Sequence, residues 1–172
     1  MRPSVTTLLP VRPPKALFVL ALVAGALVLA GCDSDSGMGD ADNGAENEVD
    51  VTITIDNIGA EAYEVTDVSG ASGVAPTGPE NPALTLSVGT RYRIDNNGGI
   101  DAHPFAFQNG ADEYLLRQEG EEAGSLEDDE DIGYREDDEG ITFTYTQALA
   151  DAVRTYRCTF HPAMEGDVQS SD

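Results

Sequence analysis

The sequence predicts an all-β protein, an antiparallel β-sandwich of the Greek-key type. Three observations lead to this fold class. Short segments rich in β-branched and aromatic residues recur through residues 49–172, clusters of turn residues separate them, and no long helical pattern lies between them. The length of this region suits one domain built around a single core.

The first predicted strand carries the clearest pattern. Val49 to Ile55 alternates apolar and polar residues with a period of two, which is typical of a half-buried strand. Further strands are predicted, in chain order, at Ala62 to Val65, Ala83 to Val88, Arg91 to Asp95, His103 to Gln108, Glu113 to Leu116, Ile141 to Thr146 and Thr155 to Cys158. Turn clusters such as residues 96–99 and 108–110 separate them. Gln147 to Val153 is predicted to form one helical turn.

A long acidic stretch, Glu119 to Gly140, interrupts this pattern. Only Leu126, Ile132 and Tyr134 offer side chains to bury there, so we expect a solvated loop. A calcium site is the alternative, because hard cations take carboxylate ligands. Residues 128–131 lack the alternating spacing and the glycine of a known calcium loop, which favours the solvated loop.

The N-terminal region is predicted to be a targeting segment. A basic leader precedes an apolar run, Ala16 to Ala30, that is short for a membrane-spanning helix. The run ends in Leu29-Ala30-Gly31-Cys32, which resembles the lipobox of bacterial lipoproteins, and an ordinary signal peptide is the alternative. We therefore expect a lipoprotein signal peptide over residues 1–31 and lipidation of Cys32. Residues 32–48 would form an acidic disordered tether that anchors the domain, residues 49–172, to a membrane facing the periplasm or cell exterior.

The charge balance restricts the possible partners. The chain holds nine Lys or Arg residues against 32 Asp or Glu, and three of the basic residues (Arg2, Arg12 and Lys15) lie in the leader. Such a surface repels nucleic acid, so we expect no nucleic-acid partner. The composition resembles that of halophile proteins, in which high salt screens the self-repulsion. An acidic face for a basic partner is the alternative, but the acids are spread along the chain.

The candidate metal ligands lie mainly in one short run near the C-terminus. Cys158, His161 and Met164 follow one another at C-x2-H-x2-M spacing, and His103 lies upstream. The chain has no other histidine, its other cysteine is Cys32, and no methionine follows position 38 except Met164. Two imidazoles, a thiolate and a weak axial thioether are the ligand types of a type 1 copper centre.

Each of these residues also has a structural interpretation. His103 could be a buried structural histidine, Cys158 a small hydrophobe and Met164 a core filler. Together, however, these interpretations require the rarest residues of the domain to fall into the ligand order by chance. An unpaired thiol in an exported protein also fits a metal ligand better than a free cysteine.

On this ligand run, residues 49–168 resemble the cupredoxins, the small blue copper proteins, with a ligand loop similar to that of the plastocyanin and amicyanin type. The motif that carries the resemblance is Y-x-C-x2-H-x2-M-x-G, ending at Gly166. The resemblance implies that His103, Cys158, His161 and Met164 bind one copper ion. It also implies a monomeric domain that carries one electron between redox partner proteins and is not an enzyme. An apolar docking rim would surround His161, formed by Pro104, Phe105, Phe160, Pro162 and Ala163.

One residue departs from the cupredoxin pattern. Many members of the family have asparagine after the first histidine, whereas this chain has Pro104, which lacks a backbone N–H. We expect fewer hydrogen bonds to the thiolate and hence a lower reduction potential. Tyr156, two residues before the cysteine, matches a structural tyrosine corner. The alternative functions are a copper-delivery lipoprotein without electron transfer and a metal-free sandwich for adhesion or assembly.

Overall fold

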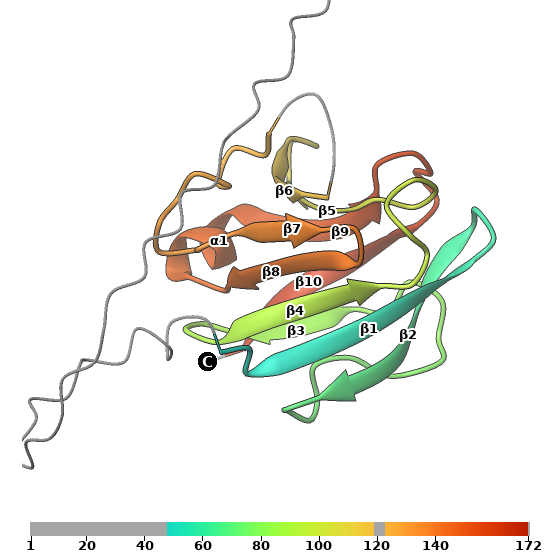
Figure 1. Cartoon of the computed structure of the whole chain (residues 1–172), viewed down its shortest axis with the longest axis horizontal. Helices are drawn as coiled ribbons and strands as arrows, with labels where there is room; N and C mark the ends of the chain where they lie inside the picture. Colours follow the sequence, from blue (N-terminus) through green and yellow to red (C-terminus); the bar gives the residue numbers. More distant parts are fainter. Residues whose placement is uncertain (1–47, 119–122, 172) are drawn as a thin grey trace, which may run out of the picture. The chain divides into compact units, whose positions relative to one another are not determined.

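The computed structural model describes residues 48–118 and 123–171, and these parts of the chain form ten strands and one short helix (Figure 1). In chain order the elements are β1 (Val51–Ile58), β2 (Ala62–Ser69), β3 (Leu84–Ser87), β4 (Arg91–Asn96), β5 (Phe105–Asn109), β6 (Tyr114–Arg117), β7 (Arg135–Asp137), β8 (Gly140–Thr144), α1 (Gln147–Ala152), β9 (Val153–Cys158) and β10 (Glu165–Ser171). The prediction of an all-β protein is confirmed.

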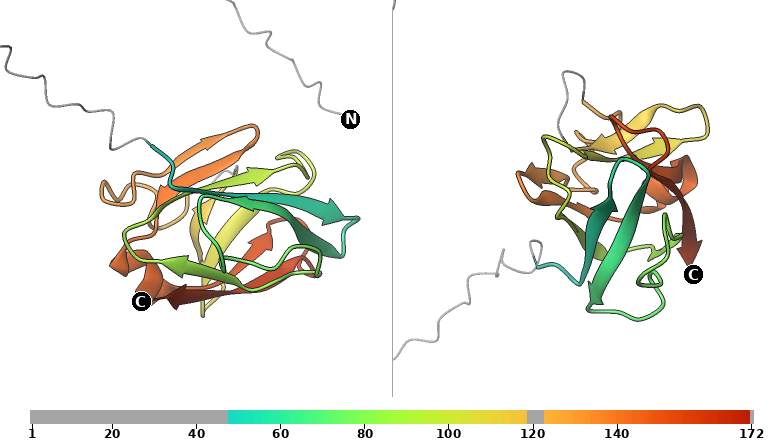
Figure 2. Two further views of the ribbon diagram at one scale, coloured as in Figure 1. Left: turned by 90° about the horizontal axis from the view of Figure 1, so that it is seen from below. Right: turned by 90° about the vertical axis from the view of Figure 1, so that its right-hand side faces the viewer.

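The strands form two five-stranded sheets. One has the order β2-β1-β4-β8-β7 and the other the order β3-β10-β9-β5-β6, and Figure 2 shows the two layers. Both sheets are mixed, because β1 pairs with β4 in parallel and β10 pairs with β3 in parallel. The predicted antiparallel arrangement therefore holds for most strand pairs but not for these two. After β2 the chain passes through β3 in the second sheet and returns as β4, which runs beside β1 in the same direction.

The core lies between the sheets and is rich in aromatic rings. Tyr63, Phe105 and Tyr156 are almost completely buried, and the rings of Phe105 and Tyr156 stack with centroids 5.6 Å apart. Phe105 also meets Phe107 edge to face, which extends the cluster toward the middle of the core. Burial of each such ring stabilises the fold by about 1.5–3 kcal/mol. Two members of this cluster adjoin the segments that carry the candidate metal ligands: Tyr63 bonds to the carbonyl of His103, and Phe105 pairs with Cys158.

Two strands were not predicted. The strand β10 has a polar sequence in which Gly166 and Val168 are the buried residues, so its sequence gives little hydrophobic alternation. It is nevertheless held by β9 on one side and β3 on the other. The three-residue β7 is fully exposed at a sheet edge, inside the acidic stretch that was expected to be a loop. The described part of that stretch also buries Ile132, so it is more structured than expected.

The other strands lie close to their predicted positions, and their ends differ by a few residues. The strand predicted from His103 begins at Phe105, because Pro104 has no N–H to join the ladder. The predicted helical turn is confirmed as α1, and the hydroxyl of Thr146 caps it by accepting a hydrogen bond from the N–H of Leu149.

The predicted signal peptide, Cys32 and all of the predicted tether except Glu48 lie outside the described residues. Within the described part of the chain, no helix has the length and apolarity that a membrane span requires.

Candidate metal centre

His103 is placed by a tight turn that follows β4. The backbone N–H of His103 donates to the carbonyl of Gly99 at 2.8 Å, which bends the chain sharply before β5 begins. Pro104 and Phe105 then lead directly into β5, which pairs with β9 so that Phe105 lies opposite Cys158. His103 is 8% exposed, and its imidazole lies next to Cys158 at the end of β9.

The other three predicted ligands lie at the start, in the middle and at the end of one turn between β9 and β10. We call residues 159–163 the ligand loop. The N–H of Cys158 donates to the carbonyl of Met164 at 2.9 Å, and the N–H of Met164 donates to the carbonyl of His161 at 3.0 Å. These two bonds close the loop on itself. The thiol of Cys158 and the thioether of Met164 are both fully buried.

The structure brings all four predicted ligands together. The Sγ atom of Cys158 lies 3.5 Å from Nδ1 of His161 and 4.0 Å from Nδ1 of His103. The Sδ atom of Met164 lies 3.1 Å from Nδ1 of His103. A thiolate and an imidazole bound to the same tetrahedral ion stand roughly 3.5 Å apart, as bond lengths of about 2.3 and 2.0 Å require. The Cys158–His161 pair has this spacing, and the Cys158–His103 pair is only slightly wider, so one metal ion could contact all three side chains.

A buried cluster of His103, Cys158 and His161 can thus hold a metal ion. One donor atom from each of these residues lies within 4.8 Å of the others, and no other such group of His, Cys, Asp or Glu occurs among the described residues. Burial lowers the pKa of His103, and the neighbouring His161 adds to this effect. A lowered pKa keeps the imidazole neutral, which is the form that binds metals.

The surroundings of His161 are more open than those of the other ligands. Its side chain is partly exposed, Phe160 is 58% exposed, and Pro162 and Ala163 are also exposed. Phe160 and Val88 are the only large apolar side chains that are exposed among the described residues. The exposed apolar surface beside the site therefore comes from the ligand loop.

Two residues of the predicted docking rim do not contribute to that surface. Pro104 is buried and Phe105 is 0% exposed, so neither can contact a partner protein. The reason is the strand register, which turns Phe105 into the core against Phe107 and Tyr156. The exposed members of the predicted rim are Phe160, Pro162 and Ala163.

Tyr156 has a structural role, but it does not form the predicted tyrosine corner. Its hydroxyl donates to the carbonyl of Pro82 at 2.7 Å, 74 residues earlier in the chain, whereas a tyrosine corner bonds to a carbonyl a few residues upstream. The ring also covers Gly166, where an added Cβ atom would overlap the phenol. The glycine that ends the ligand motif is therefore explained by close packing against Tyr156.

Three polar residues next to the ligands were missed in the sequence. Tyr63, Asn81 and Asn96 all donate hydrogen bonds to carbonyl oxygens of the segments that carry the ligands. Asn81 and Asn96 stood in turn signals, an Asn-Pro dipeptide and an Asn-Asn-Gly-Gly cluster, but nothing there indicated a role at a metal site. Tyr63 carried no signal beyond being a large aromatic residue in a predicted strand.

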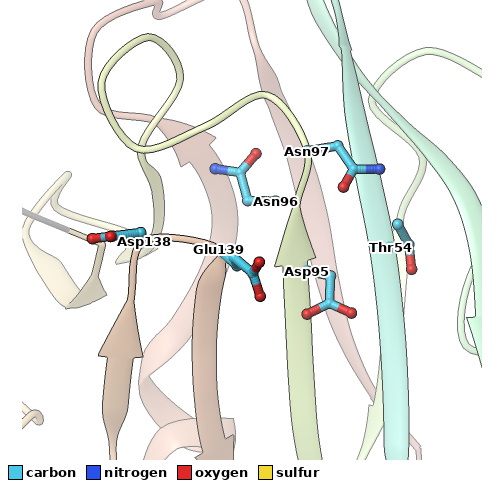
Figure 3. Close-up of a pocket in the computed structure, with 6 residues that line it drawn as sticks. All are labelled: Thr54, Asp95, Asn96, Asn97, Asp138 and Glu139. Carbon is cyan, nitrogen blue, oxygen red and sulfur yellow. The ribbon is translucent and has the colours of Figure 1, made fainter.

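A separate acidic hollow lies on the first sheet (Figure 3). Its lining residues are Thr54, Asp95, Asn96, Asn97, Asp138 and Glu139. Asp95 is engaged by the guanidinium of Arg93 at 2.7 Å, and the hollow contains no histidine or cysteine. The candidate metal centre and this hollow share only the strand end that carries Asn96.

Comparisons of the chain with protein-family models, with curated proteins and with solved structures find no match.

Proposed function

We propose that the protein binds one copper ion in a type 1 site formed by His103, Cys158, His161 and Met164 and serves as a one-electron carrier. The observation that supports this most directly is the convergence of two Nδ1 atoms, one thiol and one thioether within a few ångströms. Soft sulfur ligands combined with imidazoles favour copper, and the thioether distinguishes this set from the usual structural zinc sites. A bound copper ion would supply a one-electron redox couple.

The burial of the ligands supports a carrier rather than an enzyme. His103, Cys158 and Met164 are buried. A metal ion bound by four protein ligands would have no open position for a substrate. His161 is the ligand nearest to solvent, so electrons would enter and leave through its imidazole. The exposed side chains of Phe160, Pro162 and Ala163 would then contact redox partner proteins across a small interface, as transient electron-transfer contacts usually do.

The N-terminal sequence supports export and a membrane tether. Under this proposal Cys32 carries the lipid and the acidic segment that follows gives the domain reach outside the cytoplasm. Release of the protein from membranes by a Cys32→Ser substitution would test the anchor separately from the metal site.

The first experiment is a Cu²⁺ titration of the purified full chain, followed by visible absorption before and after addition of ascorbate. We expect an intense thiolate-to-copper band that bleaches on reduction and returns on reoxidation. Cys158→Ser should abolish the band, whereas Cys32→Ser, the matched control, should leave it unchanged. Copper bound without this band would contradict the carrier function. Rapid transfer of Cu⁺ to a soluble chelator would support the alternative, a copper-delivery lipoprotein.

A further inference from the structure

The carbonyl oxygen of His103 is held by two buried donors at once. The hydroxyl of Tyr63 donates to it at 2.7 Å, and Nδ2 of Asn96 donates to it at 2.7 Å. Tyr63 is 0% exposed and Asn96 is 3% exposed. A carbonyl oxygen has two lone pairs, so both are used here, and the backbone that carries the imidazole is fixed from two directions.

The same tyrosine is also connected to the ligand loop through its backbone. The N–H of Tyr63 donates to Oδ1 of Asn81 at 3.0 Å, and the N–H of Asn81 donates back to the carbonyl of Tyr63 at 2.8 Å. The amide Nδ2 of Asn81 then donates to the carbonyl of Ala163 at 3.0 Å. Ala163 lies between His161 and Met164, so this bond holds the end of the ligand loop next to Met164.

Asn81 adopts a backbone conformation that fits this role. Its φ is +45°, in the left-handed region that side chains other than glycine, asparagine and aspartate rarely adopt. Glycine would take this conformation with less strain but would lack the amide that reaches Ala163. The combination of a positive φ and a useful amide is what asparagine supplies at this position.

Asn96 is itself held by a buried neighbour. Its Nδ2 atom also donates to Oε1 of Gln118 at 2.9 Å, and Gln118, which is 0% exposed, donates from Nε2 to the carbonyl of Asp137 at 3.2 Å. Figure 3 shows the side chain of Asn96 pointing away from that of Asn97 at the end of β4. The amide of Asn96 is therefore fixed against the inside of the protein rather than free to turn into the acidic hollow.

We infer that Tyr63 is a positioning residue for the metal centre: its hydroxyl fixes the His103 segment, its backbone fixes the ligand loop through Asn81, and it thereby sets the distance between the two. This inference rests on the proposed metal site. Asn96 reinforces the connection to the His103 segment, and Asn81 makes the connection to the ligand loop. The chain has proline after the first histidine, so residue 104 has no side-chain amide with which to join the two ligand segments. Tyr63, on β2, connects the two segments instead.

The chemistry of Tyr63 suits a permanent structural donor. Its hydroxyl is the only polar group of the side chain, and it lies buried on the carbonyl of His103 as a donor that phenylalanine lacks. Groups that orient metal ligands in this way contribute strongly to metal affinity, and their loss typically weakens binding by about 10- to 100-fold. The ligand spacing should also be present before any metal binds, since none of these hydrogen bonds involves the metal.

The test uses Tyr63→Phe in the full chain, with Tyr145→Phe as the matched control. Tyr145 is also buried and its hydroxyl is also hydrogen-bonded at 2.7 Å, but its partner, the hydroxyl of Ser170, lies outside the ligand segments. Two readouts are needed. The first is Co²⁺ affinity by absorption titration, with Co²⁺ serving as the probe metal. The second, in the metal-free protein, is the nuclear Overhauser contact between the His103 ring and the Met164 methyl group.

We expect Tyr63→Phe to weaken Co²⁺ binding by about 10- to 100-fold and to lose the Overhauser contact, while Tyr145→Phe keeps both. Equal behaviour of the two variants would overturn the inference. Failure of the wild-type chain to bind Co²⁺ or Cu²⁺ would refute the proposed function, and the metal-free contact would still decide the positioning role.

If Tyr63→Phe does not fold, Asn81→Gly replaces it as the variant. This change accepts the positive φ and removes only the amide, so the fold should remain while the ligand loop moves away from His103. If Asn81→Gly keeps the His103–Met164 contact and the wild-type affinity, the connection from Tyr63 to the ligand loop through Asn81 does not position the ligands.

Discussion

Pro104 and Thr159 lie side by side at the candidate metal centre, joined by a single backbone hydrogen bond. The carbonyl of Pro104 accepts the backbone N–H of Thr159 at 3.0 Å, which joins the residue after His103 to the residue after Cys158. The hydroxyl of Thr159, however, is buried without a hydrogen-bond partner among the described residues. Proline has neither a backbone N–H nor a polar side chain. A polar residue at position 104 could therefore form further hydrogen bonds with Thr159, which the proline cannot.

The first prediction concerns the reduction potential of the bound copper. Pro104→Asn gives residue 104 a backbone N–H that could reach the sulfur of Cys158, and it adds a side-chain amide at a residue bonded to Thr159. A hydrogen bond to the sulfur draws charge from it and so disfavours Cu²⁺ relative to Cu⁺. We expect the potential to rise by roughly 50 mV, close to the 59 mV that corresponds to a tenfold change for a one-electron couple. Cyclic voltammetry of the copper-loaded chain measures it.

Pro104→Ala is the control for this substitution. Alanine restores the N–H and adds no amide, so any difference between the two variants reports the side chain alone. A potential that falls or stays unchanged in Pro104→Asn would contradict the expected effect of the proline.

The second prediction concerns the unpartnered hydroxyl itself. Thr159→Val replaces the hydroxyl with a methyl group of similar size, and no hydrogen bond is lost. Leaving a buried polar atom unsatisfied costs about 1–3 kcal/mol, so the free energy of unfolding should rise by about 1 kcal/mol. Urea denaturation of the metal-free protein measures the change.

Thr144→Val provides the matched comparison. The hydroxyl of Thr144 accepts a hydrogen bond from Nη1 of Arg91 at 3.0 Å, so the same substitution should destabilise the protein there by about 0.5–1.5 kcal/mol. If both variants lose stability equally, the hydroxyl of Thr159 has a partner, such as an ordered water molecule, and the prediction is wrong.

The all-β fold class and the clustering of the candidate ligands could be predicted because most of their signals are local. Alternating strands such as Val51–Ile58 show their period directly, and the three C-terminal ligands lie within seven residues of one another. The strand β10 could not be predicted, because Val168 is its only sizeable buried side chain and its place is decided by pairing with β9 and β3. The parallel pairings depend on how the chain crosses between the sheets, and the sequence of one strand does not indicate its direction relative to a neighbour.

The positioning residues were beyond sequence analysis for a related reason. Tyr63 lies 40 residues before the carbonyl that it holds, and Asn81 lies 82 residues before its acceptor in the ligand loop. Neither residue type is diagnostic, and only the register of the two sheets brings them to the ligands. Phe105 was misassigned to an exposed rim because its proximity to His103 in the sequence says nothing about which face of β5 it occupies.

The third prediction concerns the glycine that ends the ligand motif. Gly166 pairs with Tyr156 across β9 and β10, and a Cβ atom there would overlap the phenol. Gly166→Ala should therefore destabilise the protein by about 1–3 kcal/mol through overpacking, measured by thermal unfolding. Gly110→Ala is the control, because its Cβ would meet nothing closer than Cγ of Arg154 at 3.8 Å. Equal stability of the two variants would show that β10 can shift to make room.

The fourth prediction concerns pH, and it follows from the ion pair between Arg93 on β4 and Asp137 at the end of β7. Arg93 donates to both carboxylate oxygens of Asp137, at 2.7 and 2.8 Å, and the N–H groups of Glu139 and Gly140 donate to the same carboxylate. The hydrogen bonds from Arg93, with smaller contributions from these N–H groups, lower the pKa of Asp137 below its usual value.

A carboxylate with a lowered pKa in the folded state adds stability above its unfolded pKa of about 3.9, and this stability disappears as the pH falls through the lower folded value. The side chain of Asp137 is 55% exposed, so we expect the contribution to be only about 0.2–1 kcal/mol at low salt. Asp137→Asn should therefore be less stable than the wild type at pH 6, and the difference should vanish near pH 2 and shrink in high salt. Urea denaturation across this pH range measures it.

Asp138→Asn is the control, because Asp138 is an exposed neighbour without an ion pair in the described structure. It should show no such loss at pH 6, because removing a charge from this acidic surface relieves repulsion. A stability difference for Asp137→Asn that persists unchanged at pH 2 would mean that the ion pair is not its source.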